Sequence, residues 1–361
     1  MSDSNQTKPT IILGIESSCD ETSCALVVDG QRVLANTVAS QIELHARYGG
    51  VVPELASRAH IEAINTVIET ALKDANVPTE AITAIAVTHE PGLIGSLLVG
   101  LMAAKTLAWA WDKPLVGVNH VYAHAYSAAL DAGPIEYPAV AMVCSGGHTA
   151  LYRCTSPIDL ELLGTTIDDA AGEAFDKVAS ILRLGFPGGP AVDKASRTAN
   201  PQAVKFPRTL LAGQSLDFSF SGLKTAVLYH VNGVPHAVRR NQPPVDVEEV
   251  SRGIDNFTPA QVADIAASFQ SAVVDVLQIK MRRAAKLTGA KTLLLGGGVS
   301  ANSALRVAME ELASRLRCQL RLPPLKYCVD NAAMVAGLGY HYLQRGMLAP
   351  LDLEARATVR R

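Results

Sequence analysis

The chain has 361 residues, of which 48% are hydrophobic and 18% are charged, and its formal net charge is −2. This length fits two domains rather than one core, and this composition excludes an intrinsically disordered chain. A net charge near zero argues against capture of nucleic acid by bulk electrostatics, so an RNA ligand would have to meet a local basic patch or a further subunit.

The six cysteines are scattered along the chain, and no two of them form a Cys-x-x-Cys pair. Their spacing predicts neither a zinc ribbon nor a disulfide framework and suits a reducing cytosol. The polar first ten residues contain no hydrophobic segment, which argues against a signal or transit peptide. No uninterrupted apolar run reaches the length of a membrane span. We therefore expect a cytoplasmic protein that does not contact a membrane.

Strands alternate with helices along the first part of the chain. We expect helices at 54–76 and from about 96, and strands at 10–15, 24–28, 32–38, 82–88 and 114–118. Asp29 and Gly30 predict a tight turn with positive φ between two of these strands. This alternation indicates α/β layers.

A similar order of strands and helices begins again after Gly133 and Pro134. We expect a strand at 139–144, a tight turn at 145–148 and further elements at 150–154, 259–287, 292–295, 302–317 and 330–343. Two halves that each begin with a hairpin suggest a duplicated α/β fold with a cleft between two domains. We expect domain I at 10–130 with 331–348, domain II at 131–330, and an exposed insertion at 232–256.

The sharpest metal signal is the pair His120 and His124. If their segment is helical, residues four apart project from one face, and two imidazoles can converge on one cation. A pair of surface or capping histidines is an equal alternative. A third, anionic ligand is needed, and Asp330 is a candidate, although taken alone it is better interpreted as a helix N-cap. Val121 stands where a His-Glu-x-x-His metallopeptidase carries its base, which disfavours peptidase chemistry.

Three glycine-rich segments could approach a phosphate group. Residues 143–149 end a strand in a Gly-Gly turn, whose N–H groups can cradle phosphate oxygens, although such turns are also plain hairpins. Residues 295–302 follow a strand and open a helix, without the spacing of a dinucleotide fingerprint. Residues 185–190 are expected to form a loop that permits close backbone approach, with Asp193 beyond it. Together with the histidine pair, these segments suggest a nucleotide in an interdomain cleft.

Carboxylates flank these segments. Asp20 and Glu21 lie in the first hairpin turn and could position a metal or accept a proton, although turn carboxylates are more often merely solvated. Four more acids surround a short helix and are interpreted mostly as a solvated face, one of which could bind a ribose: Asp168, Asp169, Glu173 and Asp176.

Several strings resemble the tRNA threonylcarbamoyladenosine synthases, the TsaD family, formerly labelled O-sialoglycoprotein endopeptidases. They are Gly14-Ile15-Glu16-Ser17-Ser18-Cys19-Asp20-Glu21-Thr22 and residues 91–100, 119–124, 145–149, 217–226 and 296–302. They occur in the family's order, the match runs from about 11 to 343, and residues 54–60 resemble the bacterial branch. Two features depart from the family pattern: His89 and Glu90 before Pro91, and the length of 232–256.

The resemblance implies a two-domain, actin-like α/β fold of the sugar kinase, Hsp70 and actin (ASKHA) class. It implies one iron(II) or zinc ion bound by His120, His124 and Asp330. It further implies that threonylcarbamoyl-AMP is contacted by Val143, Cys144, Ser145, Gly146, Gly147, Asp176, Gly189, Asp193 and Asn302. The implied partners are tRNA and, in bacteria, a paralogous actin-like subunit and a small ATPase.

The implied reaction transfers a threonylcarbamoyl group from threonylcarbamoyl-AMP to N6 of adenosine 37, in tRNAs that read codons beginning with A. AMP leaves, and Asp20 or Glu21 would accept the amine proton. One alternative is an actin-like sugar kinase or ATPase, which would need magnesium and not the histidine pair. Another is a non-catalytic nucleotide-binding scaffold, which need not retain the three candidate ligands.

Overall fold

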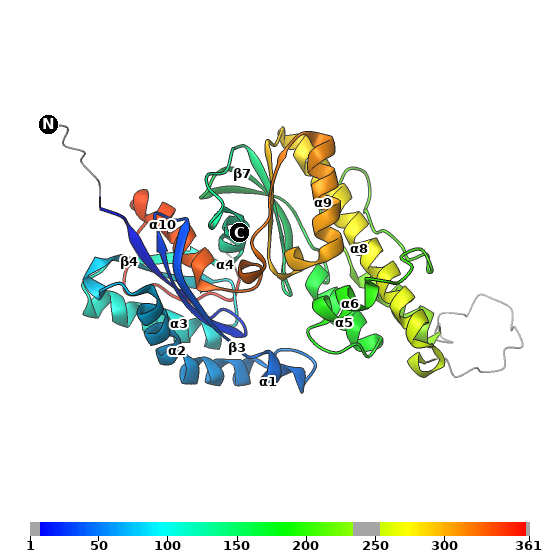
Figure 1. Ribbon diagram of the computed structural model, residues 1–361, viewed down its shortest axis with the longest axis horizontal. Coiled ribbons are helices and arrows are strands. Elements are labelled where there is room, and N and C mark those ends of the chain that lie inside the picture. The colour runs from blue at the N-terminus through cyan, green and yellow to red at the C-terminus, as the bar shows by residue number, and fades with distance from the viewer. Residues whose placement is uncertain (1–7, 234–252, 359–361) are drawn as a thin grey trace, which may run out of the picture.

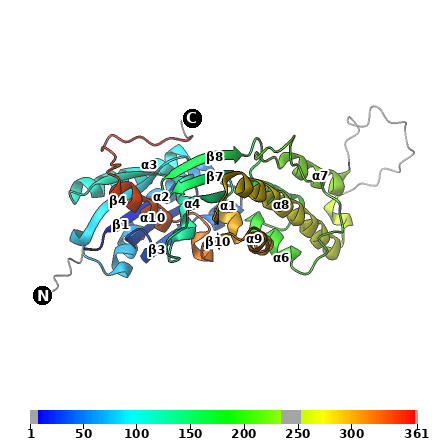
Figure 2. The same ribbon diagram turned by 90° about the horizontal axis from the view of Figure 1, so that it is seen from above.

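Two five-stranded sheets with helices on both faces form the two halves of the protein (Figure 1), which Figure 2 shows from above. The computed structural model describes residues 8–233 and 253–358. Most of the insertion expected at 232–256 lies outside these described residues. The proposed division into 10–130 with 331–348 and 131–330 stays a prediction.

The first sheet has the strand order β3-β2-β1-β4-β5. The central strand β1 pairs antiparallel with β2 and parallel with β4. The predicted turn between β2 and β3 is confirmed, since Asp29 and Gly30 have φ of 50° and 76°. The strands are Ile11–Glu16 (β1), Glu21–Val28 (β2), Arg32–Ser40 (β3), Ile82–Glu90 (β4) and Leu115–Asn119 (β5).

The second sheet repeats this topology in the order β10-β9-β6-β7-β8. Here β6 is the central strand, antiparallel to β7 and parallel to β9. The two hairpins noted in the sequence are therefore equivalent elements of a duplicated arrangement. The strands are Ala139–Cys144 (β6), Thr149–Ser156 (β7), Asp159–Thr165 (β8), Thr292–Gly296 (β9) and Gln319–Arg321 (β10).

Helices bury the first sheet on both sides, which explains why β1 is apolar up to its last residue, Glu16. Leu13 packs with α2 (Pro53–Ala75) and α3 (Ile94–Ala110), whereas its neighbour Ile12 packs with α10 (Ala332–Gln344). Gly14 permits the close approach of α10, because a Cβ atom there would lie 2.8 Å from the main-chain nitrogen of Ala336. A short helix, α1 (Ile42–Ala46), precedes α2.

The second half packs its helices around a larger core, and one helix lies between the sheets. In α4 (His120–Tyr126), Val121 packs with the second sheet, while Ala123 packs in the cluster that contains α10. The other helices are α5 (Ala171–Ile181), α6 (Gly188–Ser196), α7 (Ser221–Asn232), α8 (Pro259–Thr288) and α9 (Ser303–Leu316). Because α4 touches both halves, side chains on it can reach the space between them.

Helix α8 is long and apolar enough, by length and composition alone, to cross a membrane. However, 61% of its apolar window is buried inside the protein, as in the core helix of a domain. A capping box starts the helix, since Thr258 and Gln261 exchange side-chain and backbone hydrogen bonds.

Several elements differ from the sequence expectations; α1, α7 and β10 were not expected, and two further differences have a clear physical reason. The loop expected at 185–190 is wrong in its second half, because α6 begins at Gly188. The Gly188 N–H donates to Asp176 Oδ1 at 2.7 Å, which supplies a partner at the start of the helix. Pro190 lies in the first turn of α6, where the N–H that proline lacks would have no partner within the helix. Strand β8 was not expected, because it is an edge strand with most residues exposed or half-buried, and its apolar alternation covers only Asp159 to Leu162.

Candidate metal centre and cleft

Helix α4 carries the two histidines of the candidate metal centre. Asn119 ends β5 and caps α4, because its side-chain oxygen accepts from Val121 N–H at 2.9 Å and Tyr122 N–H at 3.1 Å. His120 and His124 therefore project from successive turns, are both buried, and have ring centroids 4.6 Å apart. The helix predicted for this pair is confirmed.

Asp330 lies on the segment that leads from the second sheet into α10. Its Oδ1 lies 2.9 Å from His124 Nε2 and 3.7 Å from His120 Nε2. The interpretation of Asp330 as a helix cap is wrong, because the Asn331 side chain accepts the capping hydrogen bond from Met334 N–H at 3.1 Å. Capping by its neighbour leaves Asp330 free to face the histidines.

The three side chains fit a divalent cation. One ligand atom from each lies within 4.8 Å of the others. Burial opposes a charge on His120, but Asp330 and Glu16 outweigh it and raise the pKa of His120 to about 9. Burial likewise opposes ionisation of Asp330, but the histidines hold its pKa well below the usual range. Two imidazoles and one carboxylate suit zinc or iron(II) better than magnesium.

Sequence reasoning missed a fourth buried group at this centre, Glu16. It ends β1, is fully buried, and its Oε2 lies 3.0 Å from His120 Nδ1. Burial opposes its ionisation, but His120 outweighs that effect and keeps the Glu16 pKa below its usual value. The available signal was an acidic residue at the end of an otherwise apolar central strand.

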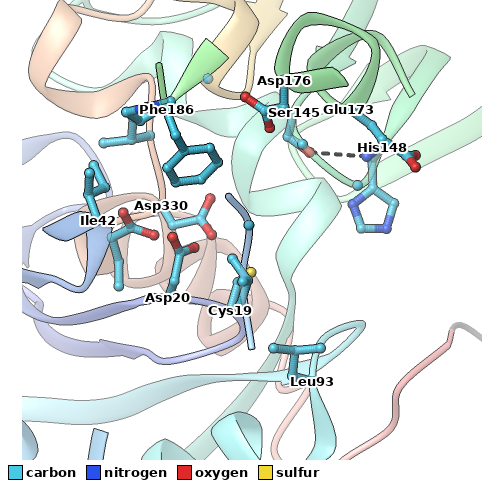
Figure 3. Close-up of a pocket in the computed structure, with 18 of the residues that line it drawn as sticks. Cys19, Asp20, Ile42, Leu93, Ser145, His148, Glu173, Asp176, Phe186 and Asp330 are labelled. Carbon is cyan, nitrogen blue, oxygen red and sulfur yellow. Dashed lines mark hydrogen bonds between the residues drawn. The ribbon is translucent and has the colours of Figure 1, made fainter. Parts of the chain in front are cut away.

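A cavity of about 1110 Å³ opens beside the metal centre, with His120 and Asp330 in its wall (Figure 3). The turn between β6 and β7 forms another part of the wall through Ser145, Gly146 and Gly147. No atom lies within 4 Å of the place where a Cβ would stand on either glycine. A ligand can therefore approach the main chain of this turn closely.

The first hairpin turn brings its carboxylates to the same cavity. Figure 3 shows Asp20 beside Asp330, and ligand atoms of Asp20, Glu21 and Asp330 lie within 4.8 Å of one another. Burial, together with the charges of Asp330 and Asp20, raises the pKa of Glu21 to about 10. His60 of α2 holds this turn, with ring nitrogens 2.7 Å from a threonine hydroxyl and 3.0 Å from a main-chain carbonyl oxygen. The interpretation of Glu21 as a solvated turn carboxylate is wrong, because it is buried.

Of the residues expected to contact threonylcarbamoyl-AMP, only some line this cavity: Ser145, Gly146, Gly147 and Asp176. Val143 and Cys144 are buried within β6, and Gly189 lies in the first turn of α6. Asp193 accepts a hydrogen bond from the Ser303 hydroxyl at 2.7 Å, and Asn302 caps α9 through Leu305 N–H at 2.9 Å. The roles of these residues toward a substrate stay predictions.

Two of the acids near α5 make specific contacts, although Asp168 is exposed as expected for a solvated face. Asp168 Oδ2 accepts from the hydroxyls of Ser219 and Ser221 at 2.6 and 2.7 Å. Asp169 forms ion pairs with Lys224 at 2.7 Å and Lys177 at 3.1 Å. Both lysines line the cavity, so Asp169 helps to hold them at its wall.

Comparison with known proteins decides the family. Residues 32–337 match the family model described as TsaD, tRNA N6-adenosine threonylcarbamoyltransferase. The tRNA N6-adenosine threonylcarbamoyltransferases of Symbiobacterium thermophilum and Thermomicrobium roseum are 51% and 50% identical to this chain, over 96% of it. Those alignments cover 95% and 96% of the relatives. The chain belongs to the TsaD family.

Solved structures confirm the two-domain, actin-like fold of this TsaD chain. HypF of T. kodakarensis superposes with a TM-score of 0.60 at 14% identity, over 94% of this chain and 50% of that protein. Full-length HypF in its phosphate- and nucleotide-bound form gives a TM-score of 0.57 at 14% identity, over 96% of this chain and 47% of that protein. At this identity the likeness concerns the fold alone, whereas the sequence match establishes a family of tRNA-modifying transferases.

Proposed function

We propose that this chain transfers the threonylcarbamoyl group of threonylcarbamoyl-AMP to N6 of adenosine 37, in tRNAs that read codons beginning with A, with release of AMP. One observation carries the proposal. His120, His124 and Asp330 converge next to a cavity that also contains the 145–147 turn, in a chain of the TsaD family.

The reaction depends mainly on activation of the electrophile, the carbamoyl carbonyl group of threonylcarbamoyl-AMP. The exocyclic amine of adenine is a weak nucleophile, because its lone pair is delocalised into the ring. The mixed anhydride of threonylcarbamoyl-AMP provides a good leaving group, and the 145–147 turn has room for its phosphate. Lys177 and Lys224 line the same cavity in ion pairs with Asp169 and Glu173, and their ammonium groups would donate hydrogen bonds to the departing AMP.

The attacking amine must also lose a proton. Asp20 is the best-placed acceptor, because it lines the cavity beside Asp330 and is more exposed than Glu21. His120, His124 and Asp330 would hold a zinc or iron(II) ion, which when bound would supply a Lewis acid for the carbonyl group and the phosphate.

We further propose that the chain works with protein partners, a paralogous actin-like subunit and a small ATPase. A net charge of −2 gives little electrostatic affinity for tRNA by itself. Helix α3 exposes an apolar stripe, with Leu98 at 45%, Met102 at 56% and Trp109 at 75% of their full accessible surface. Such a stripe is typical of a protein–protein interface.

The test is a reconstituted reaction with the partner subunits, tRNA and threonylcarbamoyl-AMP, followed by nucleoside mass spectrometry. We expect His124→Ala to lose zinc and to slow formation of N6-threonylcarbamoyladenosine by at least about 100-fold, since Lewis-acid stabilisation supplies several kcal/mol. The exposed His230 on α7 provides the matched control, and His230→Ala should keep both zinc and rate. A normal rate in His124→Ala would refute the proposed role of the metal.

A further inference from the structure

Glu16 is unusual among the carboxylates of this protein, because it is fully buried and yet has no lysine or arginine partner in an ion pair within the described residues. A buried carboxylate is costly unless hydrogen-bond donors surround it. Three donors do so here. Oε1 accepts from Ser18 N–H at 2.6 Å, while Oε2 accepts from the Thr88 hydroxyl at 2.6 Å and faces His120 Nδ1 at 3.0 Å.

These contacts determine which nitrogen of His120 can bind a cation. With Nδ1–H donating to Glu16, Nε2 is the nitrogen left to offer its lone pair to a cation, and it lies 3.7 Å from Asp330 Oδ1. A carboxylate behind a ligating histidine fixes its tautomer and ring orientation and makes it a stronger ligand. His124 has no such group, since its Nδ1 is buried without a hydrogen-bond partner in the described part of the chain.

The same carboxylate also holds the turn that follows β1. Its bond to Ser18 N–H lies at the start of the segment that carries Asp20 and Glu21 into the cavity. The Ser18 hydroxyl in turn lies 3.1 Å from His120 Nδ1. One side chain therefore sets the position of the histidine and of the acidic turn relative to each other.

We propose that Glu16 is a positioning residue, which presents His120 Nε2 to the metal and aligns the acidic turn with it. The inference rests on the proposed metal site and goes beyond it, because it assigns a role to a residue that is not a ligand. Glu16 itself does not touch the substrate cavity, so any effect on turnover passes through His120 and the turn.

Glu16→Gln is the most specific variant, because it keeps the shape of the side chain and replaces one hydrogen-bond acceptor by a donor. A carboxylate accepts on both oxygens, whereas an amide accepts on one side and donates on the other. Ser18 N–H can only donate, so the amide oxygen must face it and the NH₂ group must face His120 Nδ1. The proton of His120 then moves to Nε2, which can no longer bind a metal.

The experiment measures zinc affinity of the apo-protein by competition with a chromophoric chelator, and the visible spectrum after cobalt(II) substitution. We expect Glu16→Gln to weaken zinc binding by about 10- to 100-fold, the usual effect of losing a group that orients a ligand. The cobalt spectrum at saturation should also change, because one imidazole is lost from the ion. Glu16→Asp, which keeps the charge, should bind zinc more tightly than Glu16→Gln.

Ser17→Ala is the matched control. Ser17 is equally buried beside Glu16, but its hydroxyl donates to Ser96 O at 2.8 Å and does not contact His120. The Ser17→Ala variant should lower thermal stability while keeping wild-type zinc affinity and cobalt spectrum.

Equal zinc affinity in Glu16→Gln and Ser17→Ala would overturn the inference, as would an unchanged cobalt spectrum in Glu16→Gln. If Glu16→Gln does not fold, Glu16→Asp decides: weaker zinc binding than Ser17→Ala supports the inference, and equal binding overturns it. A wild-type protein that binds no zinc would instead refute the proposed metal site itself.

Discussion

Gly296, the last residue of β9, allows the metal-binding helix to pack against the second sheet. A Cβ atom at this position would lie 2.6 Å from the main-chain carbonyl carbon of His124 and closer still to its oxygen. Ordinary contact begins at 3.4 Å, so Gly296→Ala must push α4 away from β9 by at least about 0.8 Å to clear the carbon, and by more to clear the oxygen. Both atoms belong to the backbone, so no side-chain rotation can relieve the contact.

The size of this displacement predicts two effects of Gly296→Ala. Overpacking of this kind costs about 1–3 kcal/mol, which lowers the melting temperature by about 2–12 °C for a domain of this size. Metal–ligand distances tolerate only about 0.2 Å, so the shift of His124 should weaken zinc binding by about 10-fold or more. Calorimetry of apo- and zinc-loaded protein and a zinc competition titration measure the two quantities.

The same glycine run provides the control. Gly298 has no atom within 4 Å of its would-be Cβ, so Gly298→Ala should retain stability and zinc affinity. If Gly296→Ala melts and binds zinc like Gly298→Ala, then α4 is not held by this contact and the reasoning is wrong.

Two further predictions concern other parts of the fold. Burial lowers the pKa of His341 from 6.5 to about 4, because the charged ring would lose its hydration in the folded protein. The folded state therefore binds this proton less readily than the unfolded state. The contribution of His341 to the free energy of unfolding is complete above about pH 6.5 and is lost as the pH drops toward 4. His341→Gln should lose less stability than wild type between pH 7 and 5 in urea titrations, and equal losses would contradict this account. Asp168→Ala removes the acceptor of two serine hydroxyls and two main-chain N–H groups. Because water can reach this exposed site, the change should cost about 1 kcal/mol, and Asp168→Asn should cost less, both measured by thermal melts. Equal melting temperatures for wild type and Asp168→Ala would show that this network carries no stability.

Much of the architecture could be predicted because local signals and tertiary packing agree. The long helices and buried strands have the expected periodicity, and the Asp29-Gly30 turn requires the positive φ that the structure shows. The histidine pair was identified as a candidate ligand pair because four-residue spacing on a helix brings side chains to one face. These features depend on residues that are close in sequence.

What could not be predicted depends on contacts between distant segments. Asp330 and Asn331 are both good helix caps, and only the histidines, far away in sequence, decide that the asparagine caps and the aspartate faces the metal site. Glu16 has no local sign of its role, because its partners Thr88 and His120 come from other strands and helices. Asp168 and Asp169 likewise contact groups far away in sequence, Ser219 and Lys224.

The chain crosses between the two sheets twice, once through α4 and once through the segment before α10. His120 and His124 lie on the first crossing and Asp330 on the second. An ion bound by all three would therefore link the two crossing segments to each other. Removing that ion would loosen the connection between the two halves of the protein as well as the site itself.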